Sequence, residues 1–182
     1  MAELLTKKEQ RELLKIARGT ITSVVTSGKI PPVETALPGL NAANGCFVTI
    51  KQQGNLRGCI GNFISDQPLY RLVQEMAQAA ATHDPRFYPM KPHDLEDFSL
   101  EISVLSPLHK ISAIEEIQVG RHGIYIVKNS YRGVLLPQVA TEYGWDRDTF
   151  LKHTCLKAGL PENAWEKECE IFIFSALVFG EQ

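Results

Sequence analysis

Two tight turns, each set between stretches of alternating hydrophobicity, constrain the fold of this chain more than any other feature. Residues 46–52 alternate apolar and polar side chains, and Gln53-Gly54-Asn55 follows as a turn. Residues 56–60 should therefore return as the second arm of a hairpin. Asn129-Ser130 joins two further alternating stretches in the same way. Hairpins build antiparallel sheets, so a regular strand–helix–strand repeat is not expected.

Helical patterns lie between these hairpins. Thr6-Lys7-Lys8-Glu9 is a capping box that opens a helix ending at Gly28. Leu69 to Ala80 carries one apolar stripe at helical spacing, and Ser65 or Asp66 could cap that helix. Asp146 should cap a third helix that runs to Ala158.

Two further segments complete the predicted elements. Ser112-Ala113-Ile114-Glu115 is a second capping box and predicts a short helix. Ile171 to Phe179 is apolar on both faces and predicts a central strand. The predicted fold class is α+β, with a mixed, mostly antiparallel sheet and helices packed on it.

Composition narrows the classes of function. The chain has 182 residues, 44 % of them hydrophobic, which is enough to bury the core of one domain. Its net charge of −2 disfavours a broad electrostatic grip on nucleic acid. The longest apolar run, Ile171 to Phe179, is far shorter than the ~20 residues of a membrane-spanning helix. We therefore expect a cytoplasmic protein without a membrane segment.

The four cysteines do not indicate a metal site. Cys46, Cys59, Cys155 and Cys169 form no CxxC pair and have no histidine at zinc-finger spacing. No Rossmann, Walker or nucleophile-elbow motif is present either. No metal and no cofactor are predicted, and most of these thiols are interpreted as small buried hydrophobes.

One segment, Arg57-Gly58-Cys59-Ile60-Gly61, breaks the local rules of a strand. Strict alternation would place Leu56, Gly58 and Ile60 on the core face and Arg57 with Cys59 on the other. A guanidinium beside a thiol stabilises the reactive thiolate, or it can bind a carboxylate or phosphate with help from glycine N–H groups. The structural alternative is a buried Cys59, an Arg57 tied to a core acid and glycines used for a bulge.

Other residues are weaker candidates. His83 or His122 could act as a base for Cys59, although His122 is better explained by bonds to turn backbone. Arg86 is either a surface charge or an anion ligand. Gly58 to Gly61 also matches the bare GxxG of KH-type RNA binders, but that loop joins two helices, whereas this one follows a turn.

The chain as a whole resembles the AMMECR domain family. The Leu-Arg-Gly-Cys-Ile-Gly hallmark of that family is present without departure, and the resemblance continues in order through nearly the whole chain. The matching segments are Leu56 to Gly61, Pro68-Leu69, Asp84 to Phe87, Glu101 to Leu105, Gly120 to Gly123, Leu135 to Ala140, Gly144 to Asp146 and Cys155 to Leu160. One small departure is Asn62, where a small residue or Thr is more usual.

The resemblance implies several expectations. The fold would be a single AMMECR-type domain over residues 1–182, with a larger part, a small subdomain and a cleft between them. The family is intracellular and its biochemical function is unsettled. In bacteria and archaea, related proteins occur alongside a Memo-type protein and a radical-SAM protein, which suggests a shared pathway. The resemblance also favours a site at Arg57 to Gly61, because the polar half of this motif has no evident packing purpose.

Three functions follow from these observations. The first is a small-molecule or anion site, with Cys59 as a candidate nucleophile and Arg57, Gly58, Gly61 and Arg86 as ligand-binding residues. The second is a non-catalytic interaction module for a Memo-type or radical-SAM partner. The third is RNA or nucleotide binding, which the net charge makes the weakest. Whether the protein is an enzyme stays open at this point.

Overall fold

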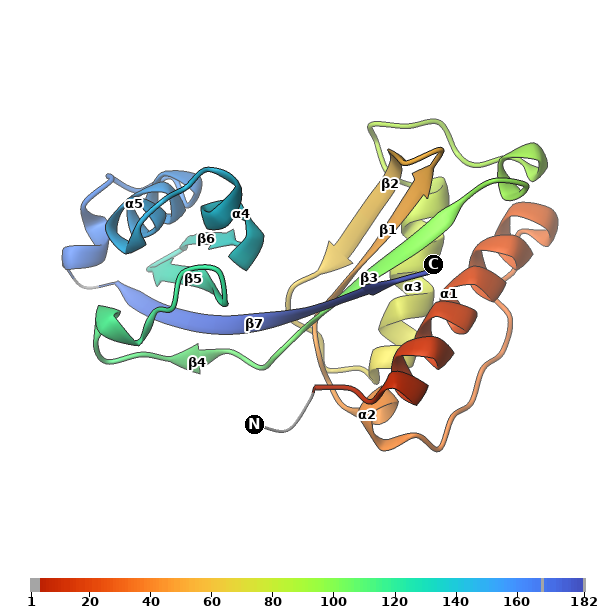
Figure 1. The fold of residues 1–182 in the computed structure, drawn as a ribbon, viewed down its shortest axis with the longest axis horizontal. Helices are drawn as coiled ribbons and strands as arrows, with labels where there is room; N and C mark the ends of the chain where they lie inside the picture. Colours follow the sequence, from red (N-terminus) through yellow and green to blue (C-terminus); the bar gives the residue numbers. More distant parts are fainter. Residues whose placement is uncertain (1–3, 168, 182) are drawn as a thin grey trace. The chain divides into compact units, whose positions relative to one another are not determined.

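The computed structural model describes residues 4–167 and 169–181. The chain divides into two compact units, and Figure 1 labels the helices and strands of each. The first unit contains the chain up to residue 105 together with the last residues from 177 onward. The second contains residues 106–176. Each unit has its own hydrophobic core.

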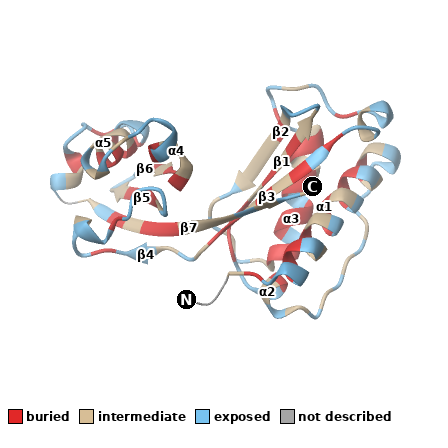
Figure 2. Cartoon of the chain, viewed as in Figure 1, coloured by how far each residue is buried: buried red, intermediate tan, exposed pale blue. Residues whose placement is uncertain are grey.

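In the first unit, two long helices lie on one face of an antiparallel sheet. Val48 and Ile50 are fully buried on the helix side of the sheet, where they join α1 and α3 residues in one core (Figure 2). The elements of this unit up to residue 105 are α1 (Lys7–Ser27), α2 (Pro38–Asn41), β1 (Cys46–Gln52), β2 (Asn55–Asn62), α3 (Leu69–Thr82), the 3-10 helix η1 (Pro92–Leu95) and β3 (Ser99–Leu105).

Local sequence signals account for most of these boundaries. The predicted capping box opens α1, since Thr6 Oγ1 accepts the Glu9 N–H and Glu9 Oε2 accepts the Thr6 N–H. Gly28 ends α1 in the left-handed conformation, and its N–H donates to Val24 O at 2.8 Å. Gln53 and Gly54 both have positive φ, as a two-residue hairpin turn between β1 and β2 requires.

One predicted helix start is wrong. The helix α3 begins at Leu69 directly after Pro68, and neither Ser65 nor Asp66 caps it. Ser65 Oγ instead accepts the N–H of Gln67, which makes a local turn before the helix. Proline fixes the backbone just ahead of the first helical turn, and that outweighs the polar cap.

The second unit packs helices on a smaller sheet. Its elements are β4 (His109–Lys110), the 3-10 helix η2 (Ile114–Glu116), β5 (His122–Lys128), β6 (Tyr131–Leu135), α4 (Pro137–Glu142), α5 (Arg147–Lys157), the 3-10 helix η3 (Ala164–Glu166) and most of β7 (Glu170–Gly180). Asp146 caps α5 as predicted, accepting the Thr149 N–H at 2.8 Å. The predicted capping box at Ser112 is displaced by one residue, because Glu116, not Glu115, accepts the N–H groups of Ser112 and Ala113.

The strand β7 contributes to both units. Its first residues pair with β4 and β5 in the second unit, and its last residues extend beside β3 in the first. The strand order β2-β1-β3-β7-β5-β6 makes β7 a central strand, as its apolar faces predicted. The α+β class with a largely antiparallel sheet is therefore confirmed. Among the described residues, no helix has the length and apolar character needed to cross a membrane.

Candidate functional site

A β-bulge lies inside the motif. The strands β1 and β2 pair in register from Cys46 opposite Asn62 to Ile50 opposite Gly58, and then Lys51 pairs with Leu56. Arg57 is the extra residue. The prediction of strict alternation is therefore wrong at this point. Leu56 lies opposite Lys51 and is 44 % exposed, rather than sharing the core face with Gly58 and Ile60.

Cys59 lies on the sheet face that points away from the helices. It pairs with Thr49, which occupies the non-core position between Val48 and Ile50. The thiol is half-buried, and the Thr49 hydroxyl donates to Cys59 Sγ at 3.2 Å. The sulfur is thus not sealed among aliphatic side chains, in contrast to Cys46 and Cys155, which are fully buried.

The two glycines of the motif permit close packing on opposite faces. A Cβ on Gly58 would lie 2.2 Å from Ala80 O, so the backbone of α3 can approach β2 only at a glycine. A Cβ on Gly61 would lie 2.1 Å from the Phe47 ring. Both positions therefore have a packing purpose, and their predicted role in ligand binding remains a prediction.

Arg57 reaches an internal acid. Its Nη2 lies 3.4 Å from Oδ2 of Asp94 in η1, and the two side chains are only 16 % and 13 % exposed. The N–H of Lys91 lowers the pKa of Asp94, and the Arg57 charge acts in the same direction. Arg57 Nη1 is buried without a hydrogen-bond partner. Among the side-chain atoms of the described residues, the only other such atom is Oε1 of Gln138 in α4. A buried unsatisfied donor is costly and marks Arg57 as unusual.

The outer edge of β2 at Cys59 is closed by a pair of side chains. Asp84, with a side chain 2 % exposed, accepts the Cys59 N–H on Oδ2 at 2.9 Å. The Arg86 guanidinium donates through Nε to Asp84 Oδ1 and through Nη2 to Oδ2 and to Cys59 O, at 3.0, 2.7 and 3.2 Å. Asp84 and Arg86 therefore bind the N–H and the C=O of Cys59, the backbone groups to which a neighbouring strand would otherwise bond.

This ion pair is electrostatically strong. The hydrogen bonds from Arg86 hold the pKa of Asp84 well below its usual range, and the Cys59 N–H adds to that effect against the cost of burial. The pKa of Arg86 is raised, first by the bond to Asp84 and also by the nearby Cys59 thiol group. The guanidinium also contacts the backbone of the residue that carries the thiol, since Arg86 Nη2 donates to Cys59 O.

Arg86 keeps one nitrogen unused. Its side chain is 54 % exposed, and within the described part of the chain Nη1 has no hydrogen-bond partner. The three bonds to Asp84 and Cys59 fix the guanidinium plane. The free Nη1 is thus a positioned, charged donor at the surface.

The two histidines do not form a visible pair with the thiol. His83 is exposed, its Nδ1 lies 2.7 Å from Thr82 Oγ1, and no described hydrogen bond connects it to Cys59. His122 belongs to the second unit, where its Nδ1 accepts the Gln118 N–H. Burial lowers the pKa of His122, and the Arg121 charge contributes further. Their roles as bases remain predictions.

Sequence reasoning missed both acids of this site. Neither Asp84 nor Asp94 is among the candidate site residues that the sequence indicates. The signal for Asp84 lay in Asp84-Pro85-Arg86, where opposite charges two residues apart can close on one another around a proline turn. No group of three or more His, Cys, Asp or Glu side chains that could hold a metal ion occurs in residues 4–167 and 169–181.

Comparison with known proteins gives one consistent answer. The AMMECR1 family model matches residues 14–179. Protein MK0488 of Methanopyrus kandleri is 42 % identical over 192 aligned positions, which cover 100 % of this chain and 93 % of that protein. Protein Mbar_A1807 of Methanosarcina barkeri is 40 % identical, with 98 % and 93 % covered.

A solved structure supports the same fold. The crystal structure of the uncharacterised protein PH0010 from Pyrococcus horikoshii superposes with a TM-score of 0.85 at 34 % identity. The superposition covers 99 % of this chain and 95 % of that chain.

Proposed function

Because the chain belongs to the AMMECR1 family, whose hallmark segment here surrounds Cys59, we propose that this segment binds a small molecule through an anionic group at the corner where Cys59 and Arg86 meet. The observation that carries the proposal is the fixed guanidinium of Arg86, which contacts the backbone oxygen of Cys59, the residue with the half-buried thiol, and leaves Nη1 unused. A carboxylate or phosphate oxygen is the matching acceptor.

The charge of the corner limits the kind of ligand. Asp84 already offsets the charge of Arg86, so a ligand gains one or two directional bonds rather than a strong electrostatic attraction. The half-buried thiol of Cys59 then contacts the less polar part of the ligand. This arrangement favours a small molecule with one anionic group over a polyanion such as RNA.

Binding is a better match to the site than nucleophilic catalysis. A cysteine nucleophile is activated by a base within hydrogen-bond reach or by a cation that stabilises the thiolate, and a proton acceptor is needed in either case. Among the described residues, the only hydrogen bond to Cys59 Sγ comes from the Thr49 hydroxyl, which cannot serve as that base at neutral pH. Thiol-dependent catalysis would therefore need a group that the ligand itself brings.

Thiol labelling tests the proposal. Iodoacetamide should modify Cys59 faster than the fully buried Cys46 and Cys155, as measured by peptide mass spectrometry over time. Millimolar malonate or inorganic phosphate should slow the labelling of Cys59, because either anion would occupy Arg86 Nη1. The same anions should protect an Arg86→Lys variant less, since an ammonium cannot keep both bonds to Asp84 and still present a fixed outward donor.

Two results would count against the small-molecule site. One is a Cys59 that reacts no faster than the buried cysteines. The other is labelling that malonate and phosphate leave unchanged in the original protein. Thr49→Val is the matched control, because it removes the hydroxyl beside the sulfur and leaves Asp84 and Arg86 in place. Anion protection should persist in that variant.

A second candidate is docking of a protein partner at the same motif. Large exposed hydrophobic side chains occur at both ends of β2 and in the loop after Asp84, namely Leu56, Ile64 and Tyr88. Exposed apolar residues around a polar motif are typical of interaction surfaces. Under this proposal the partner is the Memo-type or the radical-SAM protein that the family resemblance implies.

Co-purification separates the two candidates. Leu56→Asp combined with Tyr88→Asp should abolish recovery of a tagged Memo-type or radical-SAM partner and leave the anion protection of Cys59 intact. Val119→Asp, at an exposed position of the second unit, is the control and should not affect recovery. Equal recovery with the double variant and the original protein would exclude docking at this motif.

A further inference from the structure

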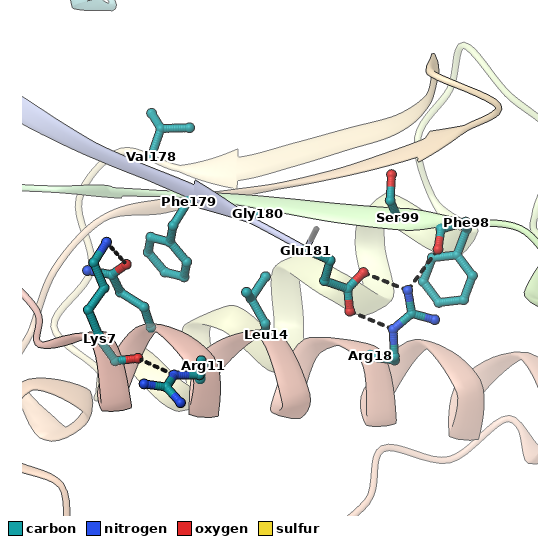
Figure 3. A pocket seen from close by; sticks show the side chains of 11 residues that line it. Lys7, Arg11, Leu14, Arg18, Phe98, Ser99, Val178, Phe179, Gly180 and Glu181 are labelled. Carbon is teal, nitrogen blue, oxygen red and sulfur yellow. Dashed lines mark hydrogen bonds and ion pairs between the residues drawn. The ribbon is translucent and has the colours of Figure 1, made fainter.

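A second surface, away from the motif, is a groove in the first unit between α1 and the end of β7 (Figure 3). Its volume is about 880 Å³, which lies in the upper part of the ~300–1,000 Å³ range of ligand sites. Leu14 and Phe179 form an apolar floor that continues into the core of the unit. Lys7 and Arg11 lie along one wall, and Val178 lies on the other.

The wall formed by β7 is an open strand edge. The strand β5 pairs with β7 only as far as Ser175, so the edge beyond that residue has no described strand beside it on that side. Glu181 N–H donates to Leu100 O at 3.0 Å, which fixes the register of this end against β3. In an antiparallel pair the bonding direction alternates, so the N–H groups of Val178 and Gly180 point outward.

Burial agrees with this register. Phe179 packs against the core on the helix side, whereas Val178 is 40 % exposed. A strand placed along the open edge would receive backbone bonds from Val178 and Gly180. Every second side chain of that strand would enter the groove toward α1. Binding between a strand edge and a helix is a recurrent mode of peptide recognition.

The charges of the groove specify the occupant. Arg18 is neutralised, because its Nε and Nη2 donate to the two carboxylate oxygens of Glu181, each at 2.6 Å. Lys7 and Arg11 have no carboxylate partner in the described residues: Lys7 Nζ donates to Gln10 Oε1 and Arg11 Nε to Lys7 O. The groove is therefore cationic in a chain whose net charge is −2. Charge complementarity requires an acidic ligand.

We propose that this groove binds an extended acidic peptide segment of a partner protein, which adds as a strand to the open edge of β7 and directs its carboxylates toward Lys7 and Arg11. The backbone bonds supply affinity without sequence preference, the two cations select acidic side chains, and the apolar floor accepts one aliphatic side chain between them.

A designed peptide probes this surface directly. The probe is a fluorescein-labelled heptapeptide with Glu, Val and Glu at positions 2, 4 and 6 and Thr at the other positions, so that the two carboxylates and the aliphatic side chain share one face. The matched control peptide has Lys in place of both Glu residues. Fluorescence anisotropy should show saturable binding of the Glu peptide that weakens as salt is raised, and at least about tenfold weaker binding of the Lys peptide. Hydrogen exchange should show new protection at the amides of Val178 and Gly180.

Two pairs of variants locate the binding. Val178→Pro removes one outward N–H without touching the bonds to β3, and Val178→Thr keeps that N–H and a branched side chain. The proline variant should bind the Glu peptide at least about tenfold more weakly, and the threonine variant as the original protein does. Lys7→Ala with Arg11→Ala should weaken binding similarly. Lys8→Ala with Lys15→Ala removes the same charge outside the groove and should not.

Several outcomes would overturn the proposal. Binding of the Glu peptide that survives Val178→Pro excludes strand addition. This holds even if a small dicarboxylate such as glutarate binds the protein and its binding requires Lys7 and Arg11. Equal loss of binding in the Lys7→Ala/Arg11→Ala variant and in the Lys8→Ala/Lys15→Ala variant would attribute the effect to net charge alone. Concentration-dependent self-association without peptide, abolished by Val178→Pro, would assign the edge to a second copy of this chain instead. Circular dichroism melts of all variants ensure that only folded proteins are compared.

Discussion

Asp84 is a charged side chain in an almost fully buried position, and its four hydrogen bonds explain why it can remain ionised. It accepts from the backbone N–H groups of Cys59 and Arg86 and twice from the Arg86 guanidinium. Four hydrogen-bond donors around a buried carboxylate stabilise its charged form. The residue therefore connects the loop after α3 to the edge of β2 and holds the motif in place.

Asp84→Asn should lower the free energy of unfolding by about 1–3 kcal/mol at pH 7, because a neutral amide loses the charge-assisted bonds. The loss is limited because Arg86 is half-exposed, so water can solvate the guanidinium that the variant leaves unpaired. Urea denaturation monitored by circular dichroism measures this. Asp146→Asn is the control, since asparagine caps a helix as well as aspartate, and it should change stability by no more than about 0.5 kcal/mol.

The same residue predicts a pH dependence. The folded-state pKa of Asp84 is depressed, so the unfolded chain binds the proton first and stability falls as pH decreases. The contribution of Asp84 is present above about pH 4, the usual range of an aspartate, and is lost progressively below it. The difference in stability between the original protein and Asp84→Asn should therefore be smaller at pH 3 than at pH 6, without vanishing, because the folded-state pKa lies well below the usual range. A difference that stays constant across that range would contradict the assignment.

At the scale of elements, the contact between β2 and α3 depends on one missing side chain. Gly58 lies on the helix face, where a Cβ would be 2.2 Å from Ala80 O. The helix cannot yield easily, because Ala77 and Ala80 are themselves fully buried against the sheet. The small residues of α3 and the glycine of β2 together set the short distance between these two elements.

Gly58→Ala should destabilise the protein by about 1–3 kcal/mol or more, because β2 and α3 must separate to admit the methyl group. Gly19→Ala is the matched control in the middle of α1, where a Cβ meets nothing within 4 Å. The same chemical change there should stabilise the protein by about 0.5–1 kcal/mol, since alanine is the better helix former. Thermal denaturation of both variants would contradict this account if their effects had the same sign.

At the scale of the whole molecule, β7 makes the first unit depend on the end of the chain. Leu177 and Phe179 pack on the core of the first unit, and Glu181 bonds to both Arg18 and Leu100. The second unit is one continuous segment, whereas the first is closed by residues that follow the second in sequence. Folding of the first unit therefore requires a contact of high sequence separation.

Termination of the chain after Ala176 should unfold the first unit locally and spare the second. Hydrogen exchange should show at least about tenfold faster exchange in α1 and β3, while amides of β5, β6 and α5 keep their protection. Termination after Gly180 is the control: it removes Glu181 and keeps Leu177 and Phe179, and it should cost only about 1 kcal/mol, since the ion pair with Arg18 is partly exposed. Equal loss of protection in both units would show that they unfold together.

The sequence by itself determined the elements and the class of fold. The capping box at Thr6, the turn at Gln53-Gly54 and the apolar faces of residues 171–179 are local signals, and each produced the predicted element. Local signals suffice here because a cap or a turn depends on hydrogen bonds between residues a few positions apart. Hydrophobic periodicity is likewise a property of a single short segment.

Only the tertiary structure decided what surrounds the motif. The bulge at Arg57 changes the face of Leu56, and the acids Asp84 and Asp94 reach β2 from 25 and 37 residues away in sequence. The alternation of faces assumes that the residues of two strands pair one to one. A single extra residue in one strand reverses the face that each residue beyond it would occupy. Which cation meets which acid depends on how the loops after α3 fold back on the sheet, and no pattern within the strand itself carries that information.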